Sequence, residues 1–306
     1  MRHLLSLRDL ASRLGLPLDE LKELEATAGK HFRPYVLKKS GRSIDEPTSR
    51  LMLAQRRVYE NLLRPLQLPD ELHGGIARRS PRTNAERHCG ARSVLRVDIK
   101  SFFPTVSNEQ VYRVWSRRLC CGTRVSQLLT RLTTFHRRLP QGAPTSMALA
   151  NLVLLDADEK IRHLAAEQAL TYTRYVDDLI FSGDDPRLVI NCVAGVLAAS
   201  GFRVSRKKLE VIGPSRLKEV TGLAVNPTPK RGPSVSRRRV ANIRAAVRQL
   251  LDFEQGSPQF ETELRRVDGR IRHVAQTNPG TARRLEHYKM STLSRDLRHF
   301  RVRAHG

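Results

Sequence analysis

Hydrophobic residues in the amino-terminal region recur at helical spacing. Across residues 1–30, leucines fall three or four positions apart, at Leu4, Leu7, Leu10, Leu14, Leu18, Leu21 and Leu24. This spacing predicts helices. The next segment, 31–47, is interrupted by proline and glycine and is predicted to be a loop or a short hairpin. A further helical pattern covers about residues 49–64, and the polar segment 65–92 is predicted to be irregular.

The middle of the chain alternates between strand and helix patterns. In residues 93–103, apolar side chains occupy alternate positions, so that Arg96 and Asp98 share the face opposite the apolar one. The predicted elements are a strand at 93–103, helices at 107–134 and 145–167, strands at 171–176 and 179–182, a helix at 186–200, and short strands at 202–204, 209–212 and 219–225. Strands interspersed with helices favour an α+β fold.

The carboxyl-terminal region is helical in pattern and strongly basic. A proline- and glycine-rich linker near residues 227–233 precedes two apolar stripes, within 240–251 and 260–274, which predict helices. Residues 229–306 contain 18 Lys and Arg and 7 Asp and Glu, a surplus of 11. We interpret the dense arginines as a nucleic-acid-binding surface and not as a solvated charged face; they are Arg237, Arg238, Arg239, Arg244 and Arg248.

The net charge of the chain indicates what kind of partner it binds. The 306 residues carry 55 Lys and Arg against 30 Asp and Glu, for a net charge of +25, and the sequence pI is about 11.0. Phosphate backbones favour such a surplus through counterion release, so we expect a nucleic-acid partner. The 40% of hydrophobic residues is enough for a folded core.

Several features argue against membrane association or secretion. No apolar run approaches the roughly 20 residues that span a bilayer, and charged residues break the amino-terminal pattern, unlike a signal peptide. Cys89, Cys120, Cys121 and Cys192 lack the spacing of a disulfide framework or a zinc site. We therefore expect a reducing, cytoplasmic location and no membrane partner.

Three carboxylates stand where chemistry could use them. Asp98 ends the predicted strand at 93–103, and Asp177 and Asp178 lie at the tip of a predicted hairpin. A polar hairpin turn would explain the adjacent acids alone, but three carboxylates on neighbouring strands of a basic protein suit a pair of Mg²⁺ ions in phosphoryl transfer. Asp156 and Asp158, on the predicted long helix, are expected to be solvated or paired within the helix.

Five motif-like segments follow one another along the chain: VDIKSFFPTV (97–106), LPQGAPTSMALANLVL (139–154), RYVDDLIFSG (174–183), SRKKLEVI (205–212) and KEVTGLAVN (218–226). In this order they resemble the palm motifs of reverse transcriptases, and KKSGRSIDEP (38–47) resembles their fingers motif. NAERH at 84–88 and VTG at 220–222 resemble two elements of the bacterial retron reverse transcriptases in particular.

This resemblance implies a right-hand polymerase fold with fingers, palm and thumb. The implied domains are N-terminal helices and fingers at 1–92, palm with part of the fingers at 93–228, and a basic helical thumb at 229–306.

The resemblance also implies roles for single residues. Asp98, Asp177 and Asp178 match the metal-binding acids, and the backbone of Ile99 would lie on the second of two Mg²⁺ ions. The positions that match nucleotide-binding residues are Lys38, Lys39, Arg42, Phe103, Gln141, Gly142 and Lys208. Phe103 matches the residue that crowds the sugar 2′ position, while Ser205 and Leu209 depart from the Asn and Thr usual around Lys208.

The implied activity is retron-type reverse transcription. The enzyme would copy part of a cognate structured noncoding RNA into single-stranded DNA from deoxynucleoside triphosphates. Synthesis would start at an RNA 2′-hydroxyl, giving a branched RNA–DNA product. Asn84 and His88 would contact this RNA or merely stabilise a loop, and nearby arginines favour the contact. The resemblance also implies an anti-phage role with an accessory effector protein.

Two alternatives remain open from the sequence. A group II intron-like or diversity-generating reverse transcriptase would share the polymerase motifs but serve another system. A catalytically silent RNA-binding scaffold would share the basic surface, and the intact acids at all three positions argue against it.

Overall fold

The computed structural model describes residues 4–38, 41–226 and 232–303, and the chain forms two compact units. Unit 1 consists of Met1–Ser80 and Arg92–Pro214, and unit 2 consists of Pro81–Ala91 and Ser215–Gly306. Most of the segments expected to be fingers and palm share one hydrophobic core in unit 1, whereas Pro81–Ala91, expected within the fingers, belongs to unit 2. The boundary expected after residue 228 differs from this division, because Ser215–Asn226 belongs to unit 2.

Unit 1 contains a four-stranded antiparallel sheet of order β4-β5-β3-β6. Its strands are β3 Ser93–Asp98, β4 Thr171–Tyr175, β5 Asp178–Gly183 and β6 Glu210–Ile212. The expected strand at 93–103 is wrong beyond Asp98, because Ser101 has a left-handed φ of 49° and helix α5 follows. Residues 202–204 form no strand and contribute only a bridge between Val204 and Ile99.

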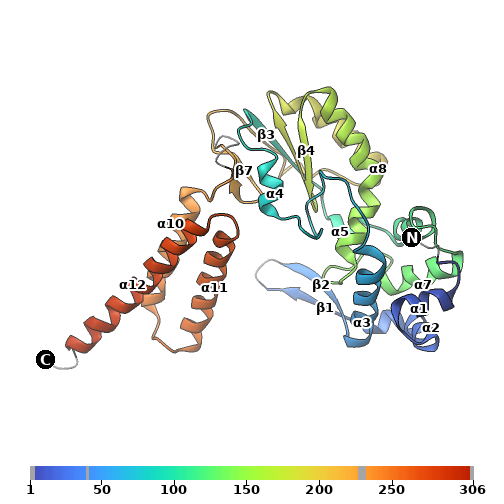
Figure 1. Cartoon of the computed structure of the whole chain (residues 1–306), viewed down its shortest axis with the longest axis horizontal. Coiled ribbons are helices and arrows are strands. Elements are labelled where there is room, and N and C mark those ends of the chain that lie inside the picture. The colour runs from blue at the N-terminus through green and yellow to red at the C-terminus, as the bar shows by residue number, and fades with distance from the viewer. Residues whose placement is uncertain (1–3, 39–40, 227–231, 304–306) are drawn as a thin grey trace. The chain divides into compact units, whose positions relative to one another are not determined.

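Helices carry most of the unit 1 core. They are α1 Leu7–Leu14, α2 Leu18–Thr27, α3 Ser49–Val58, α5 Phe102–Thr105, α6 Asn108–Arg113, α7 Thr123–Thr133, α8 Ser146–Glu167 and α9 Ile190–Ala199, with 3₁₀ turns Ala28–His31 and Pro186–Val189 and π turns Tyr59–Leu63 and Val114–Arg118. The predicted long helix α8 is confirmed, and it packs against the sheet alongside β4 (Figure 1). Helices α1, α2, α3 and α7 pack against one another. The amino-terminal leucines are buried, as their spacing predicts.

The helix expected at 107–134 is broken into two. Cys120 has a left-handed φ of 51° and is exposed, and the helical conformation stops there. The amide of Gly122 donates to the Leu4 carbonyl at 2.8 Å, and a β-carbon on Gly122 would come within 2.5 Å of the Leu5 carbonyl oxygen. The amino-terminal segment therefore passes where a continuous helix would place side chains.

A two-stranded hairpin projects from the helices of unit 1. Strands β1 Phe32–Leu37 and β2 Arg42–Pro47 pair antiparallel, which confirms the hairpin expected within 31–47. Most of its side chains are exposed. Its second strand is tied to the turn at 140–142, because the Asp45 amide donates to the Gln141 carbonyl at 2.8 Å.

Unit 2 is a three-helix bundle joined to a small strand pair. Its elements are α4 Pro81–Glu86, β7 Glu219–Val220, β8 Leu223–Ala224, α10 Arg237–Gln249, a 3₁₀ turn Leu250–Asp252, α11 Pro258–Ala275 and α12 Pro279–Arg303. The two predicted apolar stripes lie on α10 and α11 and pack with α12 around a core of their own (Figure 1). α4 was not expected, since its segment reads as polar and irregular.

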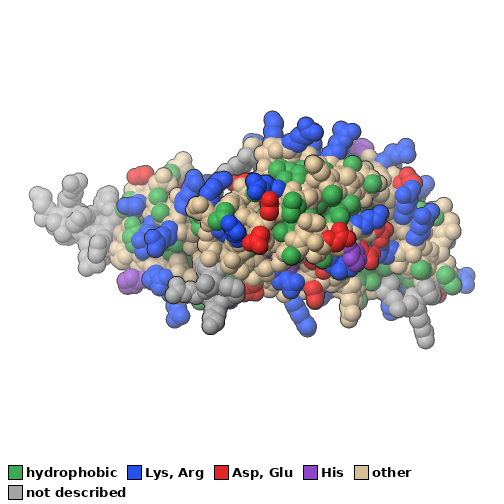
Figure 2. Space-filling model, turned by 90° about the horizontal axis from the view of Figure 1, so that it is seen from above, with side chains coloured by type: hydrophobic (Ala, Val, Ile, Leu, Met, Phe, Trp, Pro, Cys, Tyr) green, Lys and Arg blue, Asp and Glu red, His purple; other side chains and the backbone are tan. Residues whose placement is uncertain are grey.

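Lys and Arg side chains are spread over the face of the molecule shown in Figure 2, with fewer carboxylates among them. Within the described ranges, no helix is both long and apolar enough to cross a bilayer.

Candidate active site

The sheet of unit 1 brings the three predicted acids together. Asp98 ends β3 and pairs across the ladder with Asp178, the first residue of β5. Asp177 lies in the β4–β5 turn, where its carbonyl accepts a hydrogen bond from the Ile99 amide at 2.9 Å. The three side chains line one cavity of about 510 Å³. Directly paired residues on neighbouring antiparallel strands share one face of the sheet, so Asp98 and Asp178 lie on the same side, and the turn adds Asp177.

A lysine brought in from a distant loop faces these acids. The Lys208 ammonium donates to the Asp98 carboxylate at 2.6 Å, and this bond raises the pKa of Lys208. Asp98 is buried, whereas the Lys208 side chain remains 61% exposed. Lys208 therefore carries its charge and neutralises Asp98 without being locked in the interior.

Burial raises the pKa of both hairpin acids above the usual range. For Asp177, the negative charge of Asp98 adds to this rise, while Lys208 and Arg42 oppose it. For Asp178, the Arg96 guanidinium opposes the rise. Partly buried, mutually repelling carboxylates are a poor arrangement by themselves, and a bound cation would relieve it.

The three acids suit a hard divalent cation, since the metal ligands they offer are all carboxylate oxygens in one cavity. Yet no cluster of at least three His, Cys, Asp or Glu in metal-binding geometry occurs among the residues that the structure describes. Lys208 already bonds the Asp98 oxygen. The acids therefore fit the predicted metal by chemistry and by shared cavity, provided that Lys208 yields its place. The Ile99 side chain is buried and does not line this cavity.

A second cavity, of about 470 Å³, adjoins the hairpin of β1 and β2. Phe103, Gln141 and Gly142, which are predicted to bind the nucleotide, all line it. Gly142 has a φ of 103°, and a β-carbon there would lie 2.9 Å from the Ile44 side chain. Only glycine accommodates both the conformation and the contact. Met52 and Arg56 of α3 also line this cavity, and no sequence pattern indicated them.

The fingers residues predicted to hold the triphosphate differ in whether they line these cavities. Arg42 lines both cavities and is close enough to Asp177 to lower its pKa. Lys38 is exposed at the end of β1 and lines neither cavity, and Lys39 lies outside the described residues. Arg96 and Lys207 line the acidic cavity without having been singled out. The alternation that places Arg96 on the face of Asp98 was the signal available for it.

In unit 2, the two retron-like elements lie against each other. NAERH falls on α4 and just after it, and the Thr221 hydroxyl of VTG donates to the Pro81 carbonyl at 2.7 Å. Asn84 and His88 are 0% and 1% exposed. The expectation of direct RNA contact by these two side chains is therefore corrected, because interior groups present no surface to a ligand. The alternative, that they stabilise this segment, fits their burial.

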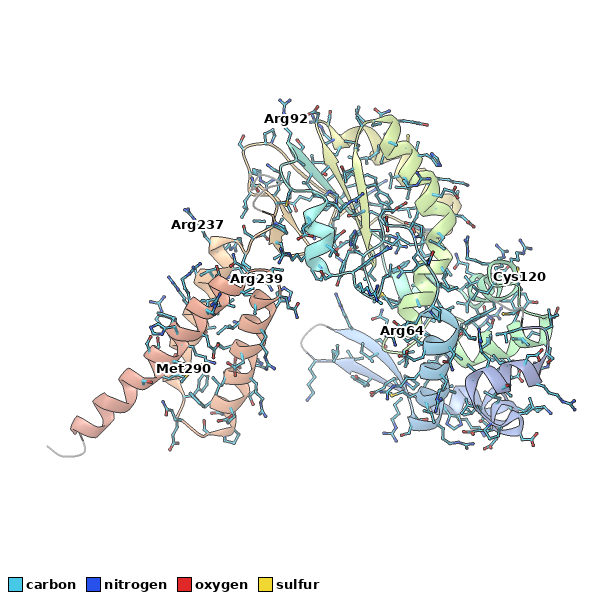
Figure 3. All side chains as sticks on the ribbon, in the orientation of Figure 1. Arg64, Arg92, Cys120, Arg237, Arg239 and Met290 are labelled. Carbon is cyan, nitrogen blue, oxygen red and sulfur yellow. The ribbon has the colours of Figure 1, made fainter. Side chains whose placement is uncertain are left out.

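The predicted arginines of α10 divide into two groups. Arg237, Arg244 and Arg248 line a groove of about 520 Å³ together with Arg284 of α12. Arg238 is exposed but outside this groove. Arg239 instead donates to the Gly222 carbonyl at 3.2 Å, so that it supports the VTG turn (Figure 3 labels Arg237 and Arg239).

Comparison with known proteins agrees with this site. Residues 21–226 match the family model described as reverse transcriptase (RNA-dependent DNA polymerase). The chain is 34% identical to the Retron Mx65 reverse transcriptase of Myxococcus xanthus, over 90% of this chain and 69% of that protein. It is 34% identical to the Retron Mx162 reverse transcriptase of the same organism, over 90% of this chain and 64% of that protein.

A third relative comes from another bacterium. The Retron Ec86 reverse transcriptase of Escherichia coli is 28% identical over 92% of this chain and 88% of its own length. The α+β, right-hand polymerase fold expected from the motifs is thereby confirmed. The chain belongs to the reverse transcriptases, the RNA-directed DNA polymerases, and among them to the bacterial retron enzymes.

Proposed function

We propose that this enzyme copies part of a cognate structured RNA into single-stranded DNA, beginning at a 2′-hydroxyl of that RNA. The observation that carries the proposal is the acidic cavity formed by Asp98, Asp177 and Asp178, in a chain that matches retron reverse transcriptases along most of its length. A branched RNA–DNA hybrid would be the product. The proposal includes a cytoplasmic location and an anti-phage role with an accessory effector.

In the proposed reaction, a hydroxyl oxygen attacks the α-phosphorus of a deoxynucleoside triphosphate. The new oxygen–phosphorus bond forms as the bond to the β-phosphate breaks, and pyrophosphate leaves. Asp98, Asp177 and Asp178 would hold two Mg²⁺ ions, which supply charge neutralisation and activate the attacking hydroxyl. Much of the remaining catalysis is positioning and electrostatics.

The chain's own cations suit the triphosphate. Arg42 lines both the acidic cavity and the cavity of Phe103, so its guanidinium can serve a ligand extending between them. Lys38 and Lys39 would assist it from the hairpin. Lys208 keeps its proton because Asp98 raises its pKa. With Asp98 engaged by a metal ion, the Lys208 ammonium would be available to stabilise the departing pyrophosphate.

Phe103 and the turn at Gln141 and Gly142 would select the deoxynucleotide. Phe103 is half-buried on α5 and lines the second cavity, opposite residues of the hairpin. A bulky ring there leaves no room for a 2′-hydroxyl. The glycine allows the backbone to approach the nucleotide closely.

The α10–α12 groove is the proposed site for RNA. Its charged lining is entirely arginine: Arg237, Arg244, Arg248 and Arg284. Arginine forks bind phosphate bidentately, and structured RNA is recognised mainly through phosphates and 2′-hydroxyls. Arg238 is exposed nearby in sequence and would add a further phosphate contact.

The proposal is tested on nucleic acid recovered with the full-length protein, expressed from its own locus. Wild type is compared with D177N, and with D184N, which makes the same charge change at an exposed site outside the cavity. We expect wild type and D184N to yield a discrete DNA that DNase removes and a debranching enzyme shortens or releases, and D177N to yield RNA only.

Other outcomes would redirect the assignment. DNA without a branch would keep the polymerase and contradict the priming, pointing to an intron-like or diversity-generating system. RNA alone from all three proteins, with no extension of a primed template in Mg²⁺, would contradict the polymerase proposal and support the RNA-binding scaffold.

A further inference from the structure

Beside the catalytic turn lies a buried polar network that joins Arg174 and Asn151, which fall within the motif segments, to Tyr172 and Asp158, which fall outside them. Arg174 of β4 is only 1% exposed and forms a bidentate pair with Asp158 of α8, at 2.8 Å from Nε and 2.7 Å from Nη2. The Tyr172 hydroxyl donates to the same carboxylate at 2.7 Å. Asp158 is thus buried and paired with the sheet, which corrects the expectation that it is solvated or paired within its helix.

The remaining arm of Arg174 reaches the hairpin itself. Its Nη1 donates to the Val176 carbonyl at 2.8 Å and to the Asn151 side-chain oxygen at 3.0 Å. Asn151 lies seven positions before Asp158 on the same face of α8, and its amide donates to the Gly74 carbonyl at 2.8 Å. One guanidinium therefore connects the long helix to the turn that carries the catalytic acids.

Val176, the residue held by this bond, has an unfavourable backbone conformation. Its φ is +63°, in the left-handed region that β-branched residues rarely enter. A residue in this region persists only when its surroundings enforce it, and such residues cluster at functional sites. Asp177 follows directly, so the orientation of Val176 sets the direction in which the acidic turn points.

The segment before α4 closes the other side of the turn. Gly74 packs so closely that a β-carbon there would lie 2.5 Å from both the amide nitrogen and the Cγ2 of Val176. The Arg174 backbone is held on both sides, since its amide donates to the Glu71 carbonyl and its carbonyl accepts from the His73 amide, each at 2.8 Å. Contacts from two directions therefore enforce the left-handed turn.

We propose that Arg174 is a positioning residue for catalysis: it holds Val176 in the left-handed conformation and thereby aims Asp177 and Asp178 into the acidic cavity. A buried ion pair is by itself weak evidence for stability. The bond to the Val176 carbonyl is what makes this pair more than a structural contact, because it acts on the turn and not on the core. The inference rests on the polymerase activity of the family.

The test compares R174K with R174K/V176G in the full chain. Lysine keeps the charge opposite Asp158 but lacks the fork that serves Asp158, Asn151 and the Val176 carbonyl together. Glycine adopts the left-handed conformation without strain. V176G alone serves as the reference, and R162K is the matched control. Arg162 also joins α8 to segment 71–75, through Glu71 at 3.3 Å, but does not reach the turn.

We expect R174K to lose about 10- to 100-fold in kcat on a primed RNA template, with KM for the deoxynucleotide changed less than about threefold. Mn²⁺, used as an electron paramagnetic resonance probe, should bind R174K more weakly. R174K/V176G should regain most of the kcat and of the Mn²⁺ affinity, and R162K should remain within about twofold of wild type in both. Neither rescue follows from a purely structural role, because glycine adds no core contact.

Three results would overturn the proposal: unchanged kcat and Mn²⁺ binding in R174K, losses that V176G fails to reverse, or equal losses in R162K. Should R174K not fold, R174Q/D158N replaces it, since this pair leaves no unpaired buried charge. The same glycine rescue then applies. If wild type itself does not extend the template, the polymerase activity on which this inference rests is contradicted. The Mn²⁺ measurement then still tests whether Arg174 positions the acids.

Discussion

Replacing Gly142 by alanine should weaken nucleotide binding without unfolding the enzyme. Gly142 has a φ of 103°, and the new β-carbon would lie 2.9 Å from Cγ2 of Ile44. That methyl group is attached directly to the β-carbon of a β-branched strand residue, so it moves away only by rotation about the restricted χ1 angle. The backbone conformation costs roughly 1–2 kcal/mol for a residue with a side chain. Relief of the overlap brings the total to roughly 2–3 kcal/mol.

The cheapest relief is a shift of the turn at 140–142 away from β2, because Gly142 is exposed at the cavity and the core lies on the other side. Such a shift enlarges the cavity where we propose the deoxynucleotide binds. If about 2 kcal/mol of the strain is paid on binding, KM for the deoxynucleotide rises roughly 30-fold. Steady-state extension of a primed RNA template measures this, with thermal unfolding followed in parallel.

G15A is the matched control for backbone strain. Gly15 ends α1 with a φ of 61°, and its β-carbon would meet nothing closer than 3.7 Å, the Arg57 guanidinium. G15A should lower the melting temperature by several degrees and leave KM unchanged. The reasoning is refuted if G142A lowers the melting temperature like G15A while KM stays within about twofold of wild type. In that case the turn would not shape the nucleotide site.

Two further predictions concern unit 2. The Lys289 ammonium is buried and donates to the Asp268 carboxylate at 2.6 Å. Burial lowers the pKa of Lys289, but its bonds to Asp268 and Glu286 outweigh burial and raise this pKa above 10.5. Its stabilisation is therefore complete below pH 10.5 and is lost as the pH rises through the higher folded-state pKa. K289M should unfold at a lower temperature than wild type near pH 8, and this difference should shrink in thermal melts as the pH is raised above 10.5; a constant difference would contradict the ion-pair account. R244Q/R248Q should weaken binding to the cognate RNA and reduce the slope of log K against log salt by roughly 1–2, whereas R270Q, an exposed change on α11 outside the groove, should change the slope by less than half as much in filter-binding titrations. Equal slopes for the two variants would argue against the groove as the RNA site.

Local patterns were sufficient to locate the acids. Alternation along 93–98 places Asp98 on the face of its strand opposite Leu95 and Val97, and the hairpin pattern places Asp177 and Asp178 at the adjoining turn. Both features depend on neighbours in sequence, so a single sequence contains them. The antiparallel register that sets Asp98 opposite Asp178 then follows from the sheet.

Features that depend on distant segments could not be predicted in this way. The break at Cys120 exists because the segment around Leu4 passes beside Gly122, more than a hundred residues away in sequence. The burial of Asn84 arises from packing of α4 against the β7–β8 pair, and nothing in a polar loop pattern announces it. Helical periodicity places Asp158 on α8 but does not reveal that its partner is Arg174, on a strand.

The acidic turn combines two unfavourable features that need support from elsewhere. Its carboxylates have raised pKa values because they are partly buried and repel one another, and Val176 has a left-handed conformation that costs roughly 1–2 kcal/mol. Left alone, the turn would relax by rotating the acids apart toward solvent, which would relieve both. The bonds from Ile99 to Asp177 and from Arg174 to Val176 oppose that rotation from either side. The acids alone do not fix the turn; backbone-directed hydrogen bonds from Ile99 and Arg174, with the Asp158 partner of Arg174 on α8, keep all three carboxylates lining one cavity.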